Sequence, residues 1–570
     1  MTPEISKTDD DARRPVPNFV WIALALLAVT TYFLGLNLPL LGPDEPRYAQ
    51  VAREMWQAGD WITPTLGGYP WFEKPALLYW LEIASFYVFG VSEFAARLGS
   101  ALFGLGTVAS LWILGSFATA DTENTEMPDD IKSASVLSVN SVAVTFPRWL
   151  ALIAASTLGI LVFSHGASFD INITFPMTAA LVCFFIFDRA SALDDPVASH
   201  HPDRETRPPL LRQEGSKSPG SDLIVASPHR RVTVSLVLFY FFIGLALLAK
   251  GLIGIIFPFA IVALYHVLSW KLPSKTFVAS LFWGSAIAVA VASIWYVPVY
   301  SRNGWPFIDE FFIQHHFQRF ATNKFQHPQP FYFFLWVLPL MTLPWLPFLI
   351  AAIWNFARGI FHPRATEATE MLADKAAFSP FHLSPLALFS TAWLLVPLVF
   401  FSFSGSKLPG YILPAVPAAI ILTAIYIFRL VEKSSKWRIA VLSLAASIFV
   451  VSIGLVLFVV PRFADTDSAK GLIVAANERG YAGVPVYSMH TISHSAEFYA
   501  AGRLLRDADG KQKKLYGPAE VVTEMQRVGV KRALVLVPIE YQKQLTEIPL
   551  LHAKIIRDNT ELVIVGVSIE

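Results

Sequence analysis

A cluster of charged residues follows the first apolar segment of the chain. It consists of Asp44, Glu45, Arg47, Glu73 and Lys74. Charges held at a membrane boundary are costly in free energy, so their presence there requires a reason. Carboxylates can accept a proton or orient a polar substrate, and cations can stabilise a departing phosphate. We therefore predict chemistry on a lipid-borne phosphate in this part of the chain.

The composition indicates a polytopic membrane protein. The chain has 570 residues, of which 54% are hydrophobic, 14% aromatic and 15% charged, whereas a soluble domain carries about 25% charged residues. A net charge of +1 without a basic block gives no indication of nucleic-acid binding. The polar, acidic beginning is a poor signal peptide, so residues 20–38 are predicted to be a retained first span.

Hydropathy predicts about 11–13 transmembrane helices, each needing roughly 20 apolar residues. The clearest segments are residues 19–40, 97–118, 148–165, 171–188, 232–249, 252–270, 278–300, 331–356, 383–402, 409–428 and 438–460. The apolar stretch 76–90 is short and contains Glu82. It is predicted either as a further span or as an interfacial helix.

Lysine and arginine collect in alternate connections, at residues 189–231, after Trp270 and at 429–438. The positive-inside rule assigns these connections, with the N-terminus, to the cytoplasm. The outward set then comprises residues 41–95, 168–170, 250–251, 301–330, 404–410 and the tail after Pro461. All the motifs discussed below fall in this set. A span at 76–90 would break the alternation unless a partner span were also missed.

The tail differs in character from the rest of the chain. Short apolar runs at 484–489, 532–538 and 561–567 alternate with polar, helix-like stretches such as 519–529, which is typical of a small α/β domain. We predict two domains. The first is a transmembrane domain of residues 1–461, with the catalytic motif in outer loop 41–95. The second is a soluble, periplasmic α/β domain of residues 462–570.

Asp44 opens a predicted amphipathic helix that continues to Ala58. An aspartate before a proline-bearing first turn is a favourable N-cap. The two faces are formed by Tyr48, Val51 and Met55 on one side and by Gln50, Arg53, Glu54 and Gln57 largely opposite. Such a helix would lie flat in the membrane interface. Asp44, Arg47 and Tyr48 share one face; alternatively, Asp44 only caps the helix and Arg47 only contacts lipid headgroups.

The second element of the charged cluster is the sequence YPWFEKP, residues 69–75. Two prolines bracket the Glu73–Lys74 pair among aromatic residues. In a solvated loop such a pair contributes little. The constrained backbone and the apolar surroundings favour a fixed site here.

These motifs resemble a known family. DEPRYA (44–49), the GDW tripeptide, the FEKP turn and LLYW (77–80) resemble the membrane glycosyltransferases of the GT-C class, which use lipid-linked sugars. The closest resemblance is to the bacterial aminoarabinose transferases that modify lipid A, relatives of the protein O-mannosyltransferases. Further matching motifs follow in order: SFDINITF (168–175), LLAKGLIG (247–254), HHFQRF (315–320), HPQPFYFF (327–334) and SGSKLPGYILPAVPA (404–418).

The chain also departs from the family pattern. The polar inserts 119–147 and 189–231 are longer than the family norm. His315 stands where an acid is common, and Ala76 replaces a second proline.

The resemblance implies a GT-C fold and a sugar donor carried on a polyprenyl phosphate. The leaving group is then an anionic lipid phosphate, which needs cations and hydrogen bonds. The candidate cations are Arg47, Lys74, Lys250, Arg319 and Lys407. Lys250 stands out because it interrupts an apolar stretch. Each of the five could instead snorkel to the headgroup level without a chemical role.

The acceptor determines what the carboxylates do. We expect Asp44 to be the central acid and Asp170 the second, with Glu45 and Glu73 as further catalytic candidates. A hydroxyl acceptor needs a general base. A phosphate acceptor is already ionised, so Asp44 would orient the sugar, its amino group or a cation. Asp170 could alternatively only cap the next span.

Tyr48, His316 and Tyr332 complete the predicted substrate-binding residues. No cofactor and no metal site is predicted. A divalent cation held by His316, His327 and Glu73 is an alternative, but these residues lack a tight ligand spacing such as HxxxH.

The favoured function is transfer of a sugar, plausibly 4-amino-4-deoxy-L-arabinose, from undecaprenyl phosphate to lipid A at the periplasmic face of a bacterial inner membrane. The expected partners are the donor, an envelope acceptor and membrane lipids. The alternative acceptors are a protein or another envelope glycan. A transporter or flippase is a third alternative, but the charges cluster at one boundary and no duplicated halves are visible.

Overall fold

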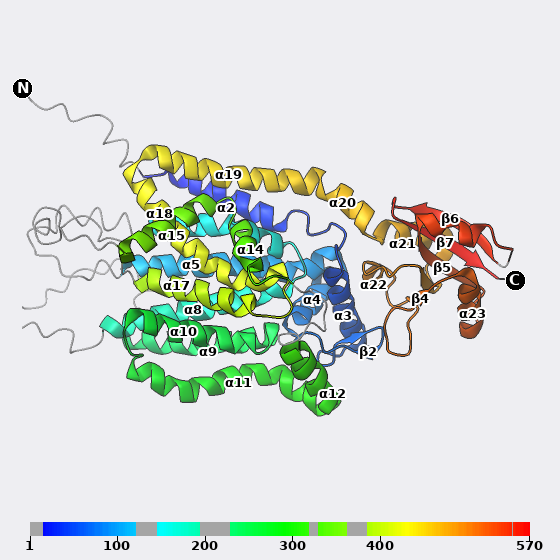
Figure 1. Ribbon diagram of the computed structural model, residues 1–570, viewed down its shortest axis with the longest axis horizontal. Coiled ribbons are helices and arrows are strands. Elements are labelled where there is room, and N and C mark those ends of the chain that lie inside the picture. Colours follow the sequence, from blue (N-terminus) through cyan, green and yellow to red (C-terminus); the bar gives the residue numbers. More distant parts are fainter. Residues whose placement is uncertain are drawn as a thin grey trace, which may run out of the picture.

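The computed structural model describes residues 15–120, 145–193, 228–318, 329–361, 385–549 and 551–569. It consists of a bundle of long apolar helices with a small sheet domain at one end (Figure 1). The short elements α3, α4, α12 and β2 lie at the end of the bundle that carries the sheet domain. We call this the site end.

Seven helices in the described part of the chain are long and apolar enough to cross a membrane, or nine if each bent pair is one span. The single spans are α5 (Glu93–Ala120), α8 (Phe169–Leu193), α9 (Pro228–Lys250), α11 (Lys275–Asn303), α17 (Pro385–Ser402), the turn Pro409–Ala415 with α18 (Val416–Lys433), and α19 (Ser435–Phe458). The apolar helices α2 (Asn18–Phe33) and α10 (Ile253–Ser269) are shorter than these spans and occupy two further predicted segments. Together, the seven spans, the two bent pairs and these two helices account for all eleven predicted apolar segments.

The stretch 76–90 forms α4 (Leu77–Phe89), a helix of 13 residues. At a rise of about 1.5 Å per residue it is roughly 20 Å long, which is shorter than the hydrocarbon core of a bilayer. It lies beside α3 at the site end (Figure 1). Of the two predicted alternatives, the structure therefore favours the helix that does not span.

Two spans are broken, and the breaks contact each other. The helix Thr145–Ala155 is bent by 59° from α7 (Leu158–Ser164), and α14 (Phe333–Met341) is bent by 117° from the helix that follows it, α15 (Leu346–Phe361). At the breaks the Leu158 N–H donates to the Leu343 carbonyl at 2.9 Å, and the Trp345 indole donates to Ser156 Oγ at 3.2 Å. Backbone groups inside a membrane need such internal partners because lipid offers none.

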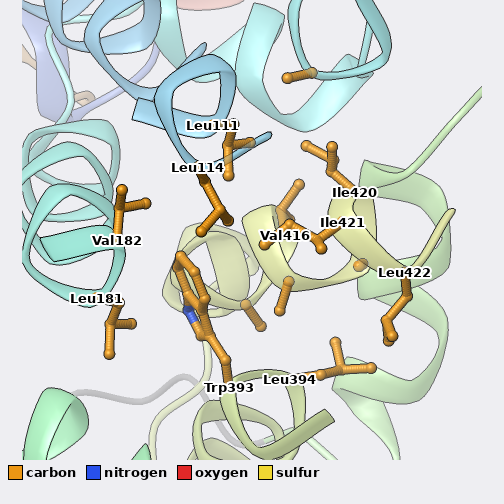
Figure 2. Close-up of a cluster of buried hydrophobic side chains, with 14 of the residues drawn as sticks. Leu111, Leu114, Leu181, Val182, Trp393, Leu394, Val416, Ile420, Ile421 and Leu422 are labelled. Atoms are coloured by element: carbon orange, nitrogen blue, oxygen red, sulfur yellow. The ribbon is translucent and has the colours of Figure 1, made fainter. Parts of the chain in front are cut away.

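The core of the bundle lies where α5, α8, α17 and α18 meet (Figure 2). Trp393 is fully buried there, and its indole N–H donates to the Pro414 carbonyl at 2.8 Å. Leu114 and Ile421 are also completely buried. This packing fixes the turn before α18, which contributes to the site described below.

The first outer loop is a compact unit. It contains α3 (Asp44–Ala58) and a hairpin of β1 (Thr65–Leu66) and β2 (Tyr69–Pro70). The hairpin turn consists of Gly67 and Gly68, both at positive φ. The Glu54 carboxylate accepts hydrogen bonds from the N–H groups of both glycines, at 2.7 and 3.0 Å. The hairpin is thereby fixed to α3, just ahead of Glu73 and Lys74.

Helix α19 leads through α20 (Val460–Asp467) and α21 (Lys470–Ala476) into the sheet domain (Figure 1). The sheet has the order β4-β3-β5-β7-β6, with β3 parallel to β4 and β5, and with β5, β7 and β6 successively antiparallel. The strands are β3 (Val486–Met489), β4 (Lys514–Leu515), β5 (Arg532–Pro538), β6 (His552–Asp558) and β7 (Leu562–Ser568); the helices are α22 (Ala496–Tyr499), α23 (Pro518–Val528) and α24 (Lys543–Thr546). The predicted small α/β domain is confirmed. The exact division at 461/462 stays a prediction.

Candidate active site

Asp44 is the first residue of α3 but not its N-cap. The cap position is Pro43, and no side chain caps the helix. The Asp44 carboxylate instead accepts a hydrogen bond from Arg47, one turn further on. The N-cap interpretation is therefore wrong, because the guanidinium takes the carboxylate away from the helix N–H groups. The shared face of Asp44 and Arg47 is confirmed.

Arg47 connects Asp44 to the second motif. Its Nη2 lies 4.0 Å from Glu73 Oε2, and Glu73 Oε1 lies 3.2 Å from Lys74 Nζ. The guanidinium also lies 5.7 and 5.6 Å from the ring centroids of Tyr48 and Trp71. Burial alone would lower the pKa of Arg47, but Glu73, Tyr48 and Asp44 together raise it above its usual value. Arg47 therefore stays charged at any physiological pH.

The carboxylates of this cluster differ in how open they are. The Asp44 side chain is 50% exposed, whereas that of Glu73 is 10% exposed. A group that acts on a substrate must be reachable. Asp44 therefore has the better access of the two, whereas Glu73 lies against the two cations. Catalytic roles for both acids stay predictions.

Glu45 has a different environment from Asp44. It accepts hydrogen bonds from Arg97 at 3.1 and 2.7 Å, from the Ala167 N–H at 2.8 Å and from the Leu41 N–H at 2.9 Å. Arg97 is 4% exposed and also donates to three backbone carbonyls between residues 36 and 39. These contacts indicate that Glu45 anchors the first outer loop to α5 and to the beginning of α8. A direct chemical role for it stays a prediction.

Asp170 pairs with Lys250. Asp170 is the second residue of α8, and Lys250 is the last residue of α9. Their side chains form an ion pair, with exposed fractions of 19% and 11%. The Asp170 N–H donates to Ser168 Oγ at 3.1 Å. The serine, and not Asp170, therefore accepts a hydrogen bond from the N–H groups of the first helical turn. The N-cap alternative for Asp170 is not supported.

The turn before α18 encloses this ion pair. Lys250 Nζ lies 4.8 Å from the centroid of the Tyr411 ring. A Cβ on Gly410 would lie only 1.8 Å from Asp170 Oδ2. Any side chain at position 410 would therefore displace the carboxylate, which explains why a glycine stands there.

One cavity is lined both by Glu73 and Lys74, from the first charged cluster, and by Lys250, the partner of Asp170. It has a volume of about 270 Å³. Its polar lining contains Glu73, Lys74, Lys250, His315, Ser404 and Tyr411; its apolar lining contains Pro75, Leu252, Ile253, Ile256, Phe317, Phe400 and Phe401. Cations from two distant motifs thus face one space that has an apolar wall on Ile253, Ile256 and Phe400 and further polar groups beside the lysines. This arrangement suits an amphiphile with an anionic head.

Three buried polar atoms beside the Asp44–Arg47 pair have no hydrogen-bond partner within the described residues. They are Arg47 Nε, Trp71 Nε1 and Tyr79 Oη. Nearly all buried polar groups in proteins are hydrogen-bonded. Their lack of a partner in the described part of the chain indicates that these groups are available to a polar molecule or to water.

The other predicted binding residues are only partly accounted for. Lys407 is 6% exposed, and its Nζ donates to the carbonyls of Gln329 and Ser404 at 3.0 and 2.6 Å; these contacts tie two loops together. Tyr332 is 51% exposed just before α14. Arg319 and the side chain of His316 lie outside the described residues. Substrate-binding roles for these four stay predictions.

Sequence reasoning missed several residues at this site. Tyr79 lies within the LLYW motif (77–80) and Tyr411 within the motif at 404–418, but nothing in either motif singles out the tyrosine. Glu310 accepts a hydrogen bond from the Phe72 N–H at 3.2 Å, next to Glu73, and burial raises its pKa. The acids of IDEFF (308–312) in an outward loop could have indicated it. Within the described residues, no group of three or more His, Cys, Asp or Glu side chains is arranged to hold a metal ion.

Comparisons with known proteins agree with this architecture. Residues 22–122 match the family model described as dolichyl-phosphate-mannose-protein mannosyltransferase. The chain is 29% identical over 407 residues to the undecaprenyl phosphate-α-4-amino-4-deoxy-L-arabinose arabinosyl transferase of Aeromonas salmonicida, and 30% identical over 409 residues to that of Yersinia enterocolitica. These alignments cover 70% and 71% of the chain but only 59% and 58% of the relatives, so the chain matches less than two thirds of their length.

The fold is that of solved structures of a similar protein. The crystal structure of ArnT from Cupriavidus metallidurans bound to undecaprenyl phosphate superposes with a TM-score of 0.69 at 20% identity, covering 97% of this chain and 98% of that one. The apo structure gives 0.67 at 19% identity. By sequence and by fold, this multi-pass membrane chain therefore resembles the polyprenyl-phosphate-sugar glycosyltransferases of the ArnT and protein mannosyltransferase group, and it has the fold of the ArnT structures.

Proposed function

We propose that this protein is a glycosyltransferase that moves an amino sugar, 4-amino-4-deoxy-L-arabinose, from undecaprenyl phosphate to lipid A. The observation that carries the proposal is the cavity in which Lys74 and Lys250 face a space with a largely apolar lining. The similar proteins of Aeromonas salmonicida and Yersinia enterocolitica are named undecaprenyl phosphate-α-4-amino-4-deoxy-L-arabinose arabinosyl transferases, which supports the same assignment.

In this proposal the cavity holds the headgroup of the donor. Lys74 and Lys250 bind the lipid phosphate, and Ile253, Ile256 and Phe400 contact the beginning of the prenyl chain. Lysine binds phosphate as a point charge, and the low dielectric of an apolar site strengthens that attraction. Glu73 and Asp170 hold the two lysines in position between turnovers.

The transfer breaks the bond between the anomeric carbon and the donor phosphate oxygen. The electron pair stays on that oxygen, where the lysines stabilise the developing charge. An acceptor oxygen forms the new bond to the same carbon. A lipid A phosphate is already ionised, so it needs no base, and Asp44 then orients the amino group of the sugar. With a hydroxyl acceptor, Asp44 takes the proton instead. The reaction as proposed uses no divalent cation.

We further propose that the site end faces the periplasm and that the membrane is a bacterial inner membrane. The end of α8 at Leu193, the beginning of α9 at Pro228 and the turn between α18 and α19 lie at the opposite end of the bundle. The sequences 189–231 and 429–438 are rich in lysine and arginine, and the positive-inside rule supports a cytoplasmic location for that end.

The decisive experiment compares lipid A and other envelope glycans, by mass spectrometry, from cells with and without this protein. Gain of one amino-pentose on a lipid A phosphate, dependent on the protein, is the expected result. The purified protein should also transfer the sugar from the synthetic donor to lipid A. Unchanged lipid A together with a protein-dependent sugar on another envelope molecule would overturn the acceptor. No transfer from any polyprenyl-phosphate sugar would overturn the enzyme class.

A further inference from the structure

The sheet domain rests on the helix that carries Asp44. Arg53, on the polar face of α3, donates from Nη1 to the Phe498 carbonyl at 2.6 Å, and its guanidinium lies 4.0 Å from the centroid of the Phe498 ring. Phe498 is 3% exposed and belongs to the same hydrophobic cluster as Tyr48 and Met55. On the polar face of α3, Arg53 is thus covered by α22 and Glu54 binds the hairpin, whereas Gln57 stays exposed. The location of this helix in the membrane interface stays a prediction.

A second contact fixes the segment just before Asp44. The Tyr499 hydroxyl accepts a hydrogen bond from the Leu40 N–H at 2.8 Å and donates to Glu93 at 3.1 Å. Lys470 pairs with the same Glu93 carboxylate at 2.6 Å. The Gly42 N–H donates to Asp467 at 3.2 Å. The sheet domain and its connecting helices thus bind the chain on both sides of Asp44.

A third contact holds the hairpin. A Cβ on Gly67 would lie 1.9 Å from Arg506 Nε, so this turn is in tight contact with the sheet domain. Arg506 pairs with Glu497, and Gln512 donates to the same carboxyl group at 2.7 Å. This network is buried. It fixes the conformation of the segment that presents Phe498 and Tyr499.

We infer that the sheet domain is a positioning element of the active site, and that Arg53 and Tyr499 are its positioning residues. Arg53 lies about 14 Å from Asp44 along one rigid helix. A displacement at this contact is therefore carried to Asp44 and Arg47. A misplacement of about 1 Å at a reacting centre can reduce the rate about 100-fold. The inference rests on the proposed function for its effect on turnover, but not for its effect on the order of α3.

The test uses Arg53→Ala, Arg53→Lys and Tyr499→Phe in the full-length protein. Two variants serve as controls: Gln57→Ala, an exposed residue on the same helix, and Arg479→Ala, which loses an arginine-to-carbonyl contact made only within the sheet domain. Hydrogen exchange of the amides between Leu40 and Arg47, thermal unfolding, and kcat and KM for the donor are measured for each.

The expected result for Arg53→Ala and Tyr499→Phe is faster exchange between Leu40 and Arg47 and a fall in kcat of about 10- to 100-fold, with Tm and donor KM near those of the unsubstituted protein. Arg53→Lys should restore most of the kcat because lysine keeps the charge over the Phe498 ring. The controls should change neither exchange nor kcat.

Unchanged exchange in both variants overturns the inference whether or not the protein transfers a sugar. Faster exchange with unchanged kcat overturns the positioning role. An equal loss in the Arg479→Ala control also overturns it, because the effect would then come from general instability of the domain. If the unsubstituted protein transfers no sugar, the proposed function fails, and the exchange data alone decide the structural part.

Discussion

Lys250 and Asp170 lie 80 residues apart in the sequence, yet they form an ion pair where the last residue of α9 meets the beginning of α8. Tyr411, from a third element, lies against the ammonium group. Three separate motifs thus converge on one charge pair beside the cavity. In such a pair the mutual attraction offsets the free-energy cost of removing both charges from water. Removal of one partner therefore leaves a buried charge without compensation.

This relationship predicts a measurable coupling between the two residues. Lys250→Met and Asp170→Asn should each lower stability and transfer, and the double variant should lose less stability than the sum of the two. A coupling energy of roughly 0.5–3 kcal/mol is expected from a double-mutant cycle of thermal or chemical unfolding. Strict additivity would mean that the two side chains do not interact in the folded protein.

Asp44→Asn should reduce kcat at least about 100-fold while leaving the protein folded and in the membrane, because the amide keeps the shape but loses the charge. The check is transfer measured alongside the unfolding temperature. Asp465→Asn, an exposed position on α20, is a matched control that should have no effect. Full turnover by Asp44→Asn would remove this carboxylate from the proposed mechanism.

Glu45→Gln tests an anchoring role against a catalytic one. The change leaves Arg97 buried without its counter-charge, so unfolding free energy should fall by roughly 2–4 kcal/mol. Residual activity should follow the folded fraction when the assay temperature is varied. A normal unfolding temperature combined with lost activity would show that Glu45 acts chemically.

Membrane sidedness can be tested by labelling single cysteines in intact cells, after replacement of the native Cys183 by alanine. Gln57→Cys on α3 should react with an impermeant maleimide from outside. Lys436→Cys, in the first turn of α19, should react only after permeabilisation. Both side chains are exposed, so access to the reagent is comparable. The reverse pattern would invert the proposed topology.

Glu310 should make stability depend on pH. Burial, followed by the nearby Glu73 carboxylate, raises the pKa of Glu310. The contribution of Glu310 to stability is therefore fully present below its pKa in the unfolded chain. It is lost as the pH rises through its raised pKa in the folded protein. The unfolding temperature of the unsubstituted protein relative to Glu310→Gln should fall as the pH is raised through and above the ordinary titration range of a glutamate. A constant difference across that range would contradict a raised pKa.

Much of the fold could be predicted from the sequence. A long apolar run in a bilayer must form a helix that satisfies its own backbone groups, so hydropathy located the segments that form the long apolar helices of the described chain. Strand β5 coincides with the run RALVLVP at 532–538 because a central strand covered on both faces is apolar throughout. The acid–base pair at Glu73 and Lys74 was also identified, since two prolines restrict its backbone.

The partners of individual side chains could not be predicted. Local spacing favours Asp44 as a helix cap, but its carboxylate accepts a hydrogen bond from Arg47 and none from the helix N–H groups. The polar face of α3 suits lipid headgroups, yet its Arg53 contacts a domain that lies more than 400 residues later in the sequence. Glu45 is an acid directly next to Asp44, and tertiary contacts with Arg97 and the Ala167 N–H give it a different environment. Side-chain partners of this kind come from elements that are distant in the sequence, so local sequence patterns do not predict them.

The size of the cavity has a consequence for the donor. A volume of about 270 Å³ lies just below the range of about 300–1,000 Å³ typical of sites that enclose a whole drug-sized ligand. It has room for a phosphate and the first part of a prenyl chain, and the remainder of an undecaprenyl tail would stay dissolved in the lipid. The protein would thus bind the phosphate end of its donor, while most of the prenyl tail would remain in the bilayer. Truncated prenyl phosphates long enough to fill the cavity and reach the lipid should then serve nearly as well as the full-length carrier.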